Sequence, residues 1–204
     1  MIDLYTYGTS NGQRVSVMLE ECALPYRPHK VDLATGEQRG EEFHKLNPSG
    51  QIPVIVDHLG PHERQIVIAQ SGAILFYLAE KSGRFLPTDP AQRAHVMEAF
   101  MQVMSDVAPT SAAIFYTHRA GGTAEAKAMW RDRFLDMLTH LDRRLARHEW
   151  LGGESLSIAD IALYPSIAGR QAILEEAPGL TSLSRWATTM ALRPAVSRGM
   201  GVPG

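Results

Sequence analysis

The chain has 204 residues, of which 45% are hydrophobic and 21% are charged, so one large or two small globular domains with a substantial core are expected. The formal net charge of −2, with no block of lysine and arginine, argues against nucleic acid or an anionic membrane as a partner. No secretion signal and no apolar run of about 18 residues is found, which favours a cytoplasmic protein. Because there is a single cysteine, an intramolecular disulfide is excluded and a metal site built from cysteines is not expected.

The first part of the chain predicts the element order βαβ followed by ββα. Alternating, β-branched and aromatic residues indicate strands over 2–7, 26–32, 54–56 and 65–68. A turn over 8–12 precedes a helix over 13–22, whose apolar stripe includes Cys22. A further helix over 71–81 ends at Ser82-Gly83.

The second part of the chain predicts helices only. Residues 83–90 contain two prolines and no hydrophobic period, which is typical of a linker between domains. Long helices follow over 91–117 and 124–148, and the sequence from Ser157 to Asp160 indicates a capping box at the start of another helix. A last helix is expected over 180–192. The fold class is therefore an α/β domain over 1–82 and an all-α domain over 91–204.

Two short segments of the first domain predict a binding site for a small anionic peptide. Pro53 opens an apolar strand and cannot donate a ladder hydrogen bond, so the backbone groups of Ile52 are free to pair with a peptide-like ligand. Ser71 offers a hydroxyl and unpaired N–H groups at a helix N-terminus, a setting that suits a carboxylate.

Three blocks of sequence, in this order, give the chain its resemblance to a known family. They run from Asn47 to Val54, from Gln70 to Leu78 and from Trp150 to Asp160. With them the chain resembles the cytosolic glutathione transferase family over nearly its full length. The resemblance implies a thioredoxin-like N-terminal domain that binds glutathione, a helical C-terminal domain that lines the co-substrate pocket, and a homodimer.

The same resemblance assigns the glutathione-binding residues. It implies a cis peptide bond at Pro53, with the backbone of Ile52 pairing with the cysteinyl unit of glutathione. Gln70 and Ser71 would hold the γ-glutamyl end, with glutamine at a position where many members have glutamate. Gln38 and Gln51, in the loops that flank the groove, are candidates for the glycyl end.

Four residues after the first strand compete to stabilise the glutathione sulfur. Thr9, Asn11 and Gly12, with the preceding strand, resemble the bacterial nu class and its disulfide-reducing relatives, in which the threonine and asparagine hold the sulfur. Tyr7 would fit a tyrosine-type class, and Ser10 a theta-like serine mechanism. The alternative from the residues alone is that Thr9 and Asn11 only build the turn and cap the helix.

Other residues that could carry chemistry have simpler structural explanations. Cys22 falls on a buried helical stripe, and the eight histidines show no metal-ligand spacing, so a core thiol and surface histidines are expected. A row of methionines that includes Met101 and Met104 has the spacing of core residues. By the resemblance these two, together with Tyr116 and His118, could instead line the second-substrate pocket.

The sequence therefore predicts an enzyme that uses glutathione as co-substrate and needs no metal. Glutathione transferase chemistry on an electrophile, or reduction of a disulfide or peroxide, is expected, with the loop residues favouring reduction. The alternative is a non-catalytic dimer that keeps the fold as an interaction or regulatory module. A thioredoxin-type oxidoreductase with its own redox cysteines is disfavoured, because the chain has no C-x-x-C motif.

Overall fold

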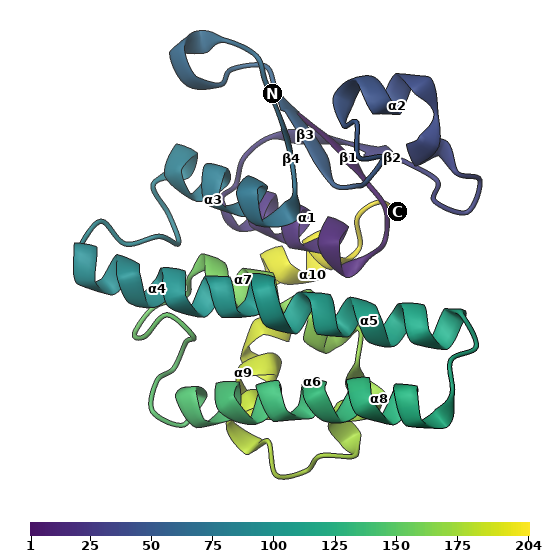
Figure 1. Ribbon diagram of the computed structural model, residues 1–204. Helices are drawn as coiled ribbons and strands as arrows, with labels where there is room; N and C mark the ends of the chain where they lie inside the picture. The colour runs from purple at the N-terminus through teal and green to yellow at the C-terminus, as the bar shows by residue number, and fades with distance from the viewer. The chain divides into compact units, whose positions relative to one another are not determined.

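The computed structural model describes residues 1–204 and divides them into two compact units (Figure 1). The first unit combines Met1–Arg84 with Ala191–Gly204, and the second is Phe85–Met190. Residues 191–204 were expected in the helical domain, and their place in the first unit corrects that boundary. None of the helices combines the length and the apolar character needed to cross a membrane.

A four-stranded sheet forms the centre of the first unit. Its strands are β1 (Ile2–Thr6), β2 (Tyr26–Lys30), β3 (Val54–Asp57) and β4 (Ile66–Ala69), in the spatial order β2-β1-β3-β4. β1 and β2 are parallel, whereas β3 is antiparallel to both β1 and β4. The order βαβ-ββα of the sequence prediction is therefore present.

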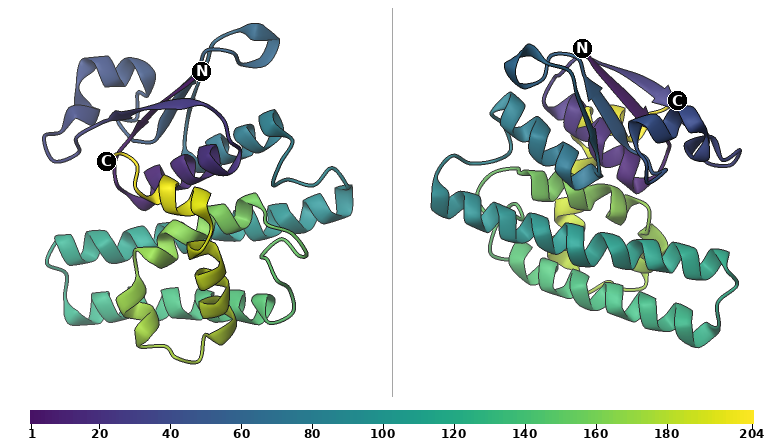
Figure 2. Two further views of the ribbon diagram at one scale, coloured as in Figure 1. Left: turned by 180° about the vertical axis from the view of Figure 1, so that it is seen from behind. Right: turned by 45° about the horizontal axis from the view of Figure 1, so that its top comes forward.

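Helices cover both faces of this sheet (Figure 2). α1 (Ser10–Glu21) and α3 (Ser71–Ser82) contact each other on one face, and α2 (Glu41–Leu46) lies on the other. Short 3₁₀ turns occupy Glu37–Arg39 and Pro61–Glu63. α2 was not predicted from the sequence. It packs through Phe43 against Val31 and Val54, with Leu46 partly buried beside them, whereas the other four residues of this short helix are exposed.

The C-terminal helix α10 (Pro194–Met200) belongs to the first unit because it packs directly on α1. A side chain at Gly199 would come within 2.5 Å of the Val17 Cα, so only glycine permits this approach. The Ser16 hydroxyl donates to the Gly199 carbonyl at 2.6 Å, and the Arg193 guanidinium pairs with the buried Glu21 carboxylate at 2.6 and 2.9 Å. These contacts explain why the end of the chain returns to its beginning.

The second unit consists of helices alone. They are α4 (Pro90–Gln102), α5 (Ala108–Arg119), α6 (Ala124–Leu145), α7 (Ile158–Ala168), α8 (Gln171–Glu175) and α9 (Thr181–Ala191). A π-helical turn over Val103–Val107 joins α4 to α5, so the helix expected over 91–117 changes its winding at its middle. The core includes Phe134, Leu138 and Trp186, and most of α7 is buried.

The expected capping box is present at the start of α7. The Asp160 carboxylate accepts from the amide and the hydroxyl of Ser157 at 3.0 and 2.8 Å. It also accepts from the Leu151 amide and the Trp186 indole N–H, both at 2.9 Å. Burial raises the pKa of Asp160, and these four donors oppose that effect. Asp160 therefore organises the interior of the helical unit.

Candidate functional site

The strand register brings the predicted site segments to one end of the sheet. Tyr5 of β1 pairs with Val54 of β3, and Val54 pairs with Ala69 of β4. These three paired residues lie side by side on adjacent strands. Three segments therefore come together at this end of the sheet: the loop after β1, the Ile52-Pro53 segment before β3, and the start of α3 after β4. Because β2 is parallel to β1, the segment that contains Gln38 also leaves the sheet at this end.

Thr9 is the N-cap of α1, which begins at Ser10, three residues before the predicted start at Gln13. Its hydroxyl accepts a hydrogen bond from the Gly12 amide at 3.3 Å, and its own amide donates to the Tyr7 carbonyl at 2.6 Å. A Cβ on Gly12 would lie 2.3 Å from that carbonyl oxygen, so the tight loop requires glycine there. In its capping bond the Thr9 hydroxyl acts as acceptor, which leaves its proton available to an outside acceptor.

Asn11 lies in the first turn of α1 and is exposed. Its side-chain oxygen accepts a hydrogen bond from the Arg14 guanidinium, so the amide NH₂ group is the end that can donate to a ligand. Arg14 is buried beneath this turn, and burial lowers its pKa to about 10. Sequence reasoning missed Arg14 as a positioning residue, because a buried arginine has no distinctive sequence pattern.

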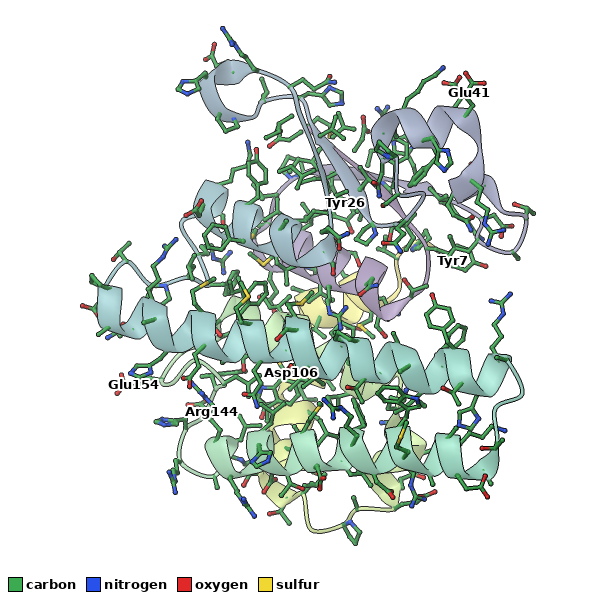
Figure 3. The ribbon with its side chains drawn as sticks, in the orientation of Figure 1. Tyr7, Tyr26, Glu41, Asp106, Arg144 and Glu154 are labelled. Carbon is green, nitrogen blue, oxygen red and sulfur yellow. The ribbon has the colours of Figure 1, made fainter.

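Tyr7 and Ser10, the two competing candidates, occupy the same loop. Tyr7 follows β1 directly and is partly buried (Figure 3), and Ser10 is the first residue of α1. All four candidates for the sulfur thus lie within one short segment at the N-terminus of α1. The positive end of that helix favours a negative charge placed near them.

Ile52 precedes a cis peptide bond to Pro53, as the resemblance implies. Its side chain packs against the cluster of Val31, Phe43 and Val54. Its amide and carbonyl lie outside β3 and have no hydrogen-bond partner within the chain. The backbone of Ile52 is therefore fixed in place with both of its polar groups free for a ligand.

Asn47 holds the loop that presents Ile52. Its side-chain NH₂ donates to the Gln51 carbonyl at 2.7 Å, and its oxygen accepts from the amide and hydroxyl of Ser49 at 3.1 and 2.8 Å. Asn47 is buried, although it belongs to a polar loop. It opens the first of the three sequence blocks that carry the resemblance, and its three side-chain hydrogen bonds give the physical reason for its presence.

Gln70 and Ser71 form the N-terminal end of α3. Gln70 has φ 71° and ψ 115°, a conformation that side-chain-bearing residues rarely adopt and that costs about 1–3 kcal/mol. Ser71 is only 5% exposed, and its hydroxyl has no partner within the chain. The first amides of a helix lack intrahelical partners, so a hydroxyl and several N–H groups face the same place.

Gln38 and Gln51 flank this end of the sheet. The Gln38 side-chain oxygen is buried without a hydrogen-bond partner, which a ligand N–H could supply. A Cβ on Gly50 would lie 3.1 Å from the Gln38 carbonyl oxygen, so the two loops touch. The Gln51 side chain is exposed, and its carbonyl is used by Asn47.

The remaining candidates divide between the two units. Cys22 is buried 3.3 Å from the Ser82 hydroxyl, and burial raises the pKa of its thiol, which fits a core residue. His29 and His58, expected as isolated surface residues, both contact the Asp3 carboxylate, at 2.9 and 2.7 Å. No group of three or more histidine, cysteine or acidic side chains is arranged to hold a metal ion.

The residues suggested for a co-substrate pocket all lie in the helical unit. Met101 is 51% exposed on α4 and Tyr116 is 65% exposed on α5. Met104 lies in the π-helical turn and is partly buried, and His118 is exposed near the end of α5. Met101 and Tyr116 are large exposed apolar side chains, which is consistent with contact to an apolar molecule.

Comparison with known proteins agrees with the resemblance. Residues 10–81 match the model of the glutathione S-transferase N-terminal domain, and residues 124–187 match that of the C-terminal domain. The chain is 35% identical to the disulfide-bond oxidoreductase YfcG of Escherichia coli (strain K12), over 98% of this chain and 94% of that protein. It is 34% identical to YghU, a disulfide-bond oxidoreductase of the same strain, over 97% of this chain and 73% of that protein.

Solved structures show the same likeness. A glutathione transferase family member from Pseudomonas fluorescens Pf-5, with two glutathione molecules bound, superimposes with a TM-score of 0.94 at 33% identity, covering 99% of this chain and 93% of that chain. A glutathione transferase from Pseudomonas putida, with one glutathione disulfide bound per subunit, gives 0.92 at 33% identity, covering 100% and 92%.

Proposed function

Because the chain belongs to the glutathione S-transferase family, we propose that it catalyses glutathione-dependent reduction of disulfides, using the glutathione thiolate as nucleophile. The observation that carries the proposal is the meeting of three features at one end of the sheet. These are the free backbone of Ile52, the open N-terminus of α3 at Ser71 and the Thr9 hydroxyl at the start of α1.

Glutathione would lie along Ile52 with its γ-glutamyl end on α3. The backbone amide and carbonyl of Ile52 would pair with the cysteinyl unit in the manner of a short β-ladder. The Ser71 hydroxyl and the first amides of α3 would bind the γ-glutamyl carboxylate. Gln70 offers an amide oxygen to the ligand ammonium without a charge, so binding at this end would depend mainly on Ser71. Gln38 and Gln51 are assigned to the glycyl end.

The sulfur would sit at the N-terminus of α1. A free thiol has a pKa of about 8.5, so the site must favour the thiolate for reaction near neutral pH. The Thr9 hydroxyl and the Asn11 NH₂ group can both donate a hydrogen bond to the sulfur. Each is held in place, because the Thr9 hydroxyl oxygen accepts from the Gly12 amide and the Asn11 side-chain oxygen accepts from Arg14. Tyr7 and Ser10 are the competing donors, and their single replacements decide between the assignments.

The reaction is a thiol–disulfide exchange. The glutathione thiolate attacks one sulfur of the substrate, a new S–S bond forms, and the old one breaks with release of a thiolate that takes up a proton. A second glutathione thiolate then attacks the glutathione sulfur of the mixed disulfide, which forms glutathione disulfide and releases the second substrate thiolate to take up a proton, so two glutathione thiols are oxidised for each disulfide reduced. The relatives crystallised with two glutathione molecules or one glutathione disulfide support this stoichiometry.

A direct test compares three measurements on the purified protein. Glutathione binding is measured by calorimetry, and turnover is measured against a small disulfide and against a dinitrochlorobenzene-type electrophile. We expect binding, with faster turnover of the disulfide. Faster turnover of the electrophile would assign the protein to conjugation, and binding without either turnover would favour the non-catalytic alternative.

A Cys22→Ser variant tests whether the chain uses a thiol of its own. Cys22 is buried and its thiol pKa is raised, so we expect the variant to retain disulfide turnover. Loss of turnover in a folded variant would contradict the mechanism. A homodimer is also proposed, and sedimentation velocity would establish it or show a monomer.

A further inference from the structure

The helical unit contains a recess that the proposed reaction does not use. It has a volume of about 450 Å³ and lies between α4 and the C-terminal end of α6. Its lining is strongly basic: His95, Glu98, Gln102, His140, Arg143, Arg144, Arg147 and His148. Three arginines and three histidines thus face a single carboxylate. None of these residues is a candidate for the glutathione site.

Arg144 is fixed in the wall of the recess. It lies between α4 and α6 (Figure 3), where its guanidinium donates to the Leu151 carbonyl at 2.6 Å, to the His95 carbonyl at 3.2 Å and to Glu98 at 3.2 Å. The Glu98 carboxylate also lies 3.9 Å from the His95 ring. The only acidic group of the recess is therefore already engaged by Arg144.

Arg143 and Arg147 are the cations left for a ligand. Both are exposed, and neither guanidinium has a hydrogen-bond or ion-pair partner within the chain. Arg143 lies in the last turn of α6 and Arg147 lies two residues beyond the end of that helix, while His140 stands one turn before Arg143 on the same side. Two planar guanidinium groups that line one recess suit two neighbouring oxyanion groups, each bound through paired N–H donors.

Helix stabilisation accounts for only part of this cluster. Basic residues in the last turn of a helix interact favourably with its negative end, which explains Arg143 and Arg144. Arg147 and His148 follow the end of α6, however, and His95 comes from α4. A concave site in which Arg147, from beyond the helix end, lies with the unpaired Arg143 and with histidines of two elements is better explained by an anionic ligand.

We propose that this recess binds a small molecule with two adjacent phosphate-like groups, held by Arg143 and Arg147. The volume is sufficient for a ligand of nucleotide size. The shared chemistry is a pair of neighbouring oxyanions, which either an inorganic diphosphate or an organic diphosphate ester provides.

Calorimetry with the full chain tests the proposal. Pyrophosphate and adenosine diphosphate are titrated separately, with inorganic phosphate and succinate as single-phosphate and dicarboxylate comparisons. We expect saturable binding of pyrophosphate or adenosine diphosphate at least 10-fold tighter than that of phosphate or succinate. Tighter binding of the ester would identify an organic ligand. If neither diphosphate binds, or if all four anions bind equally, the proposal is wrong.

Variants on the same helix provide the matched control. Arg143→Gln combined with Arg147→Gln should weaken pyrophosphate binding at least 10-fold and leave glutathione turnover unchanged. Arg133→Gln removes an exposed arginine of α6 that does not line the recess, and should leave binding unchanged. Equal loss in both proteins would show general charge attraction and overturn the proposal. Thermal unfolding of each variant confirms that it is folded.

Discussion

Thr9 is predicted to perform two separable tasks, and its replacement by valine removes both. Valine keeps the shape of threonine but has no hydroxyl. The hydroxyl caps α1 through the Gly12 amide at 3.3 Å, a long bond, so its loss should lower the free energy of unfolding by about 0.5–1 kcal/mol. Chemical denaturation measures this effect without glutathione.

The second task concerns the bound sulfur. A hydrogen bond to a charged group contributes about 1.5–3 kcal/mol, and one pKa unit corresponds to about 1.4 kcal/mol. Losing the Thr9 donor should therefore raise the pKa of bound glutathione by about 1–2 units. The thiolate is the reacting form, but its nucleophilicity rises with its pKa and offsets about half of the loss on a logarithmic scale, so turnover at a fixed pH below that pKa should fall about 3- to 10-fold, with glutathione affinity little changed.

The assay is a pH titration of the thiolate absorbance of bound glutathione, together with the pH dependence of kcat. Thr9→Ser keeps the hydroxyl and should resemble the wild-type protein in both. Tyr7→Phe and Ser10→Ala test the competing donors in the same way. If Thr9→Val lowers stability but leaves the thiol pKa and turnover unchanged, Thr9 is a helix cap only and the sulfur assignment is refuted.

Ser71→Ala should raise the Kd for glutathione about 10-fold, because the γ-glutamyl carboxylate loses a hydrogen-bond donor worth about 1.4 kcal/mol. An unchanged Kd in calorimetry would contradict the assignment of this carboxylate to Ser71. Asp160→Ala leaves buried donors of Ser157, Leu151 and Trp186 unpaired, so it should lower the free energy of unfolding by about 3–5 kcal/mol. Glu154→Ala is the control: it removes an exposed acid before the same helix and should leave the free energy of unfolding almost unchanged. Hydrogen bonds from Arg27 and the two histidines lower the pKa of Asp3 below its usual value, although burial opposes them. The ionised carboxylate therefore stabilises the fold above about pH 4, and that contribution is lost as the pH falls further. Asp3→Asn should therefore flatten the decrease of unfolding free energy in acid, and an unchanged acid profile would exclude this role.

The strands and the long helices could be predicted from the sequence because each carries a clear period. The four strands lie close to their predicted positions, and the capping box at Ser157 and Asp160 is present as expected. The start of α1 was placed three residues late. Its first turn contains serine, asparagine and glycine, which are typical of a loop, whereas the structure makes it helical with hydrogen bonds from the Gly12 and Gln13 amides to Thr9.

Features that depend on distant contacts could not be predicted. α2 has six residues, and Phe43 alone of these is buried, so it has no helical period to detect. The return of residues 191–204 to the first unit depends on the fit of Gly199 against Val17, and these two residues are far apart in the chain. The backbone availability of Ile52 and Ser71 was predictable from local rules for proline and helix ends, whereas the role of Arg14 beneath Asn11 was not.

The position of α10 on α1 has a consequence for biosynthesis. The first unit needs residues 191–204 to cover α1, so its final packing must wait until those residues have been synthesised, after the whole of the second unit. The second unit is continuous, from Phe85 to Met190, and has all its residues available earlier. During translation the unit that carries the proposed glutathione site is therefore completed after the helical unit, although most of its residues are synthesised before that unit.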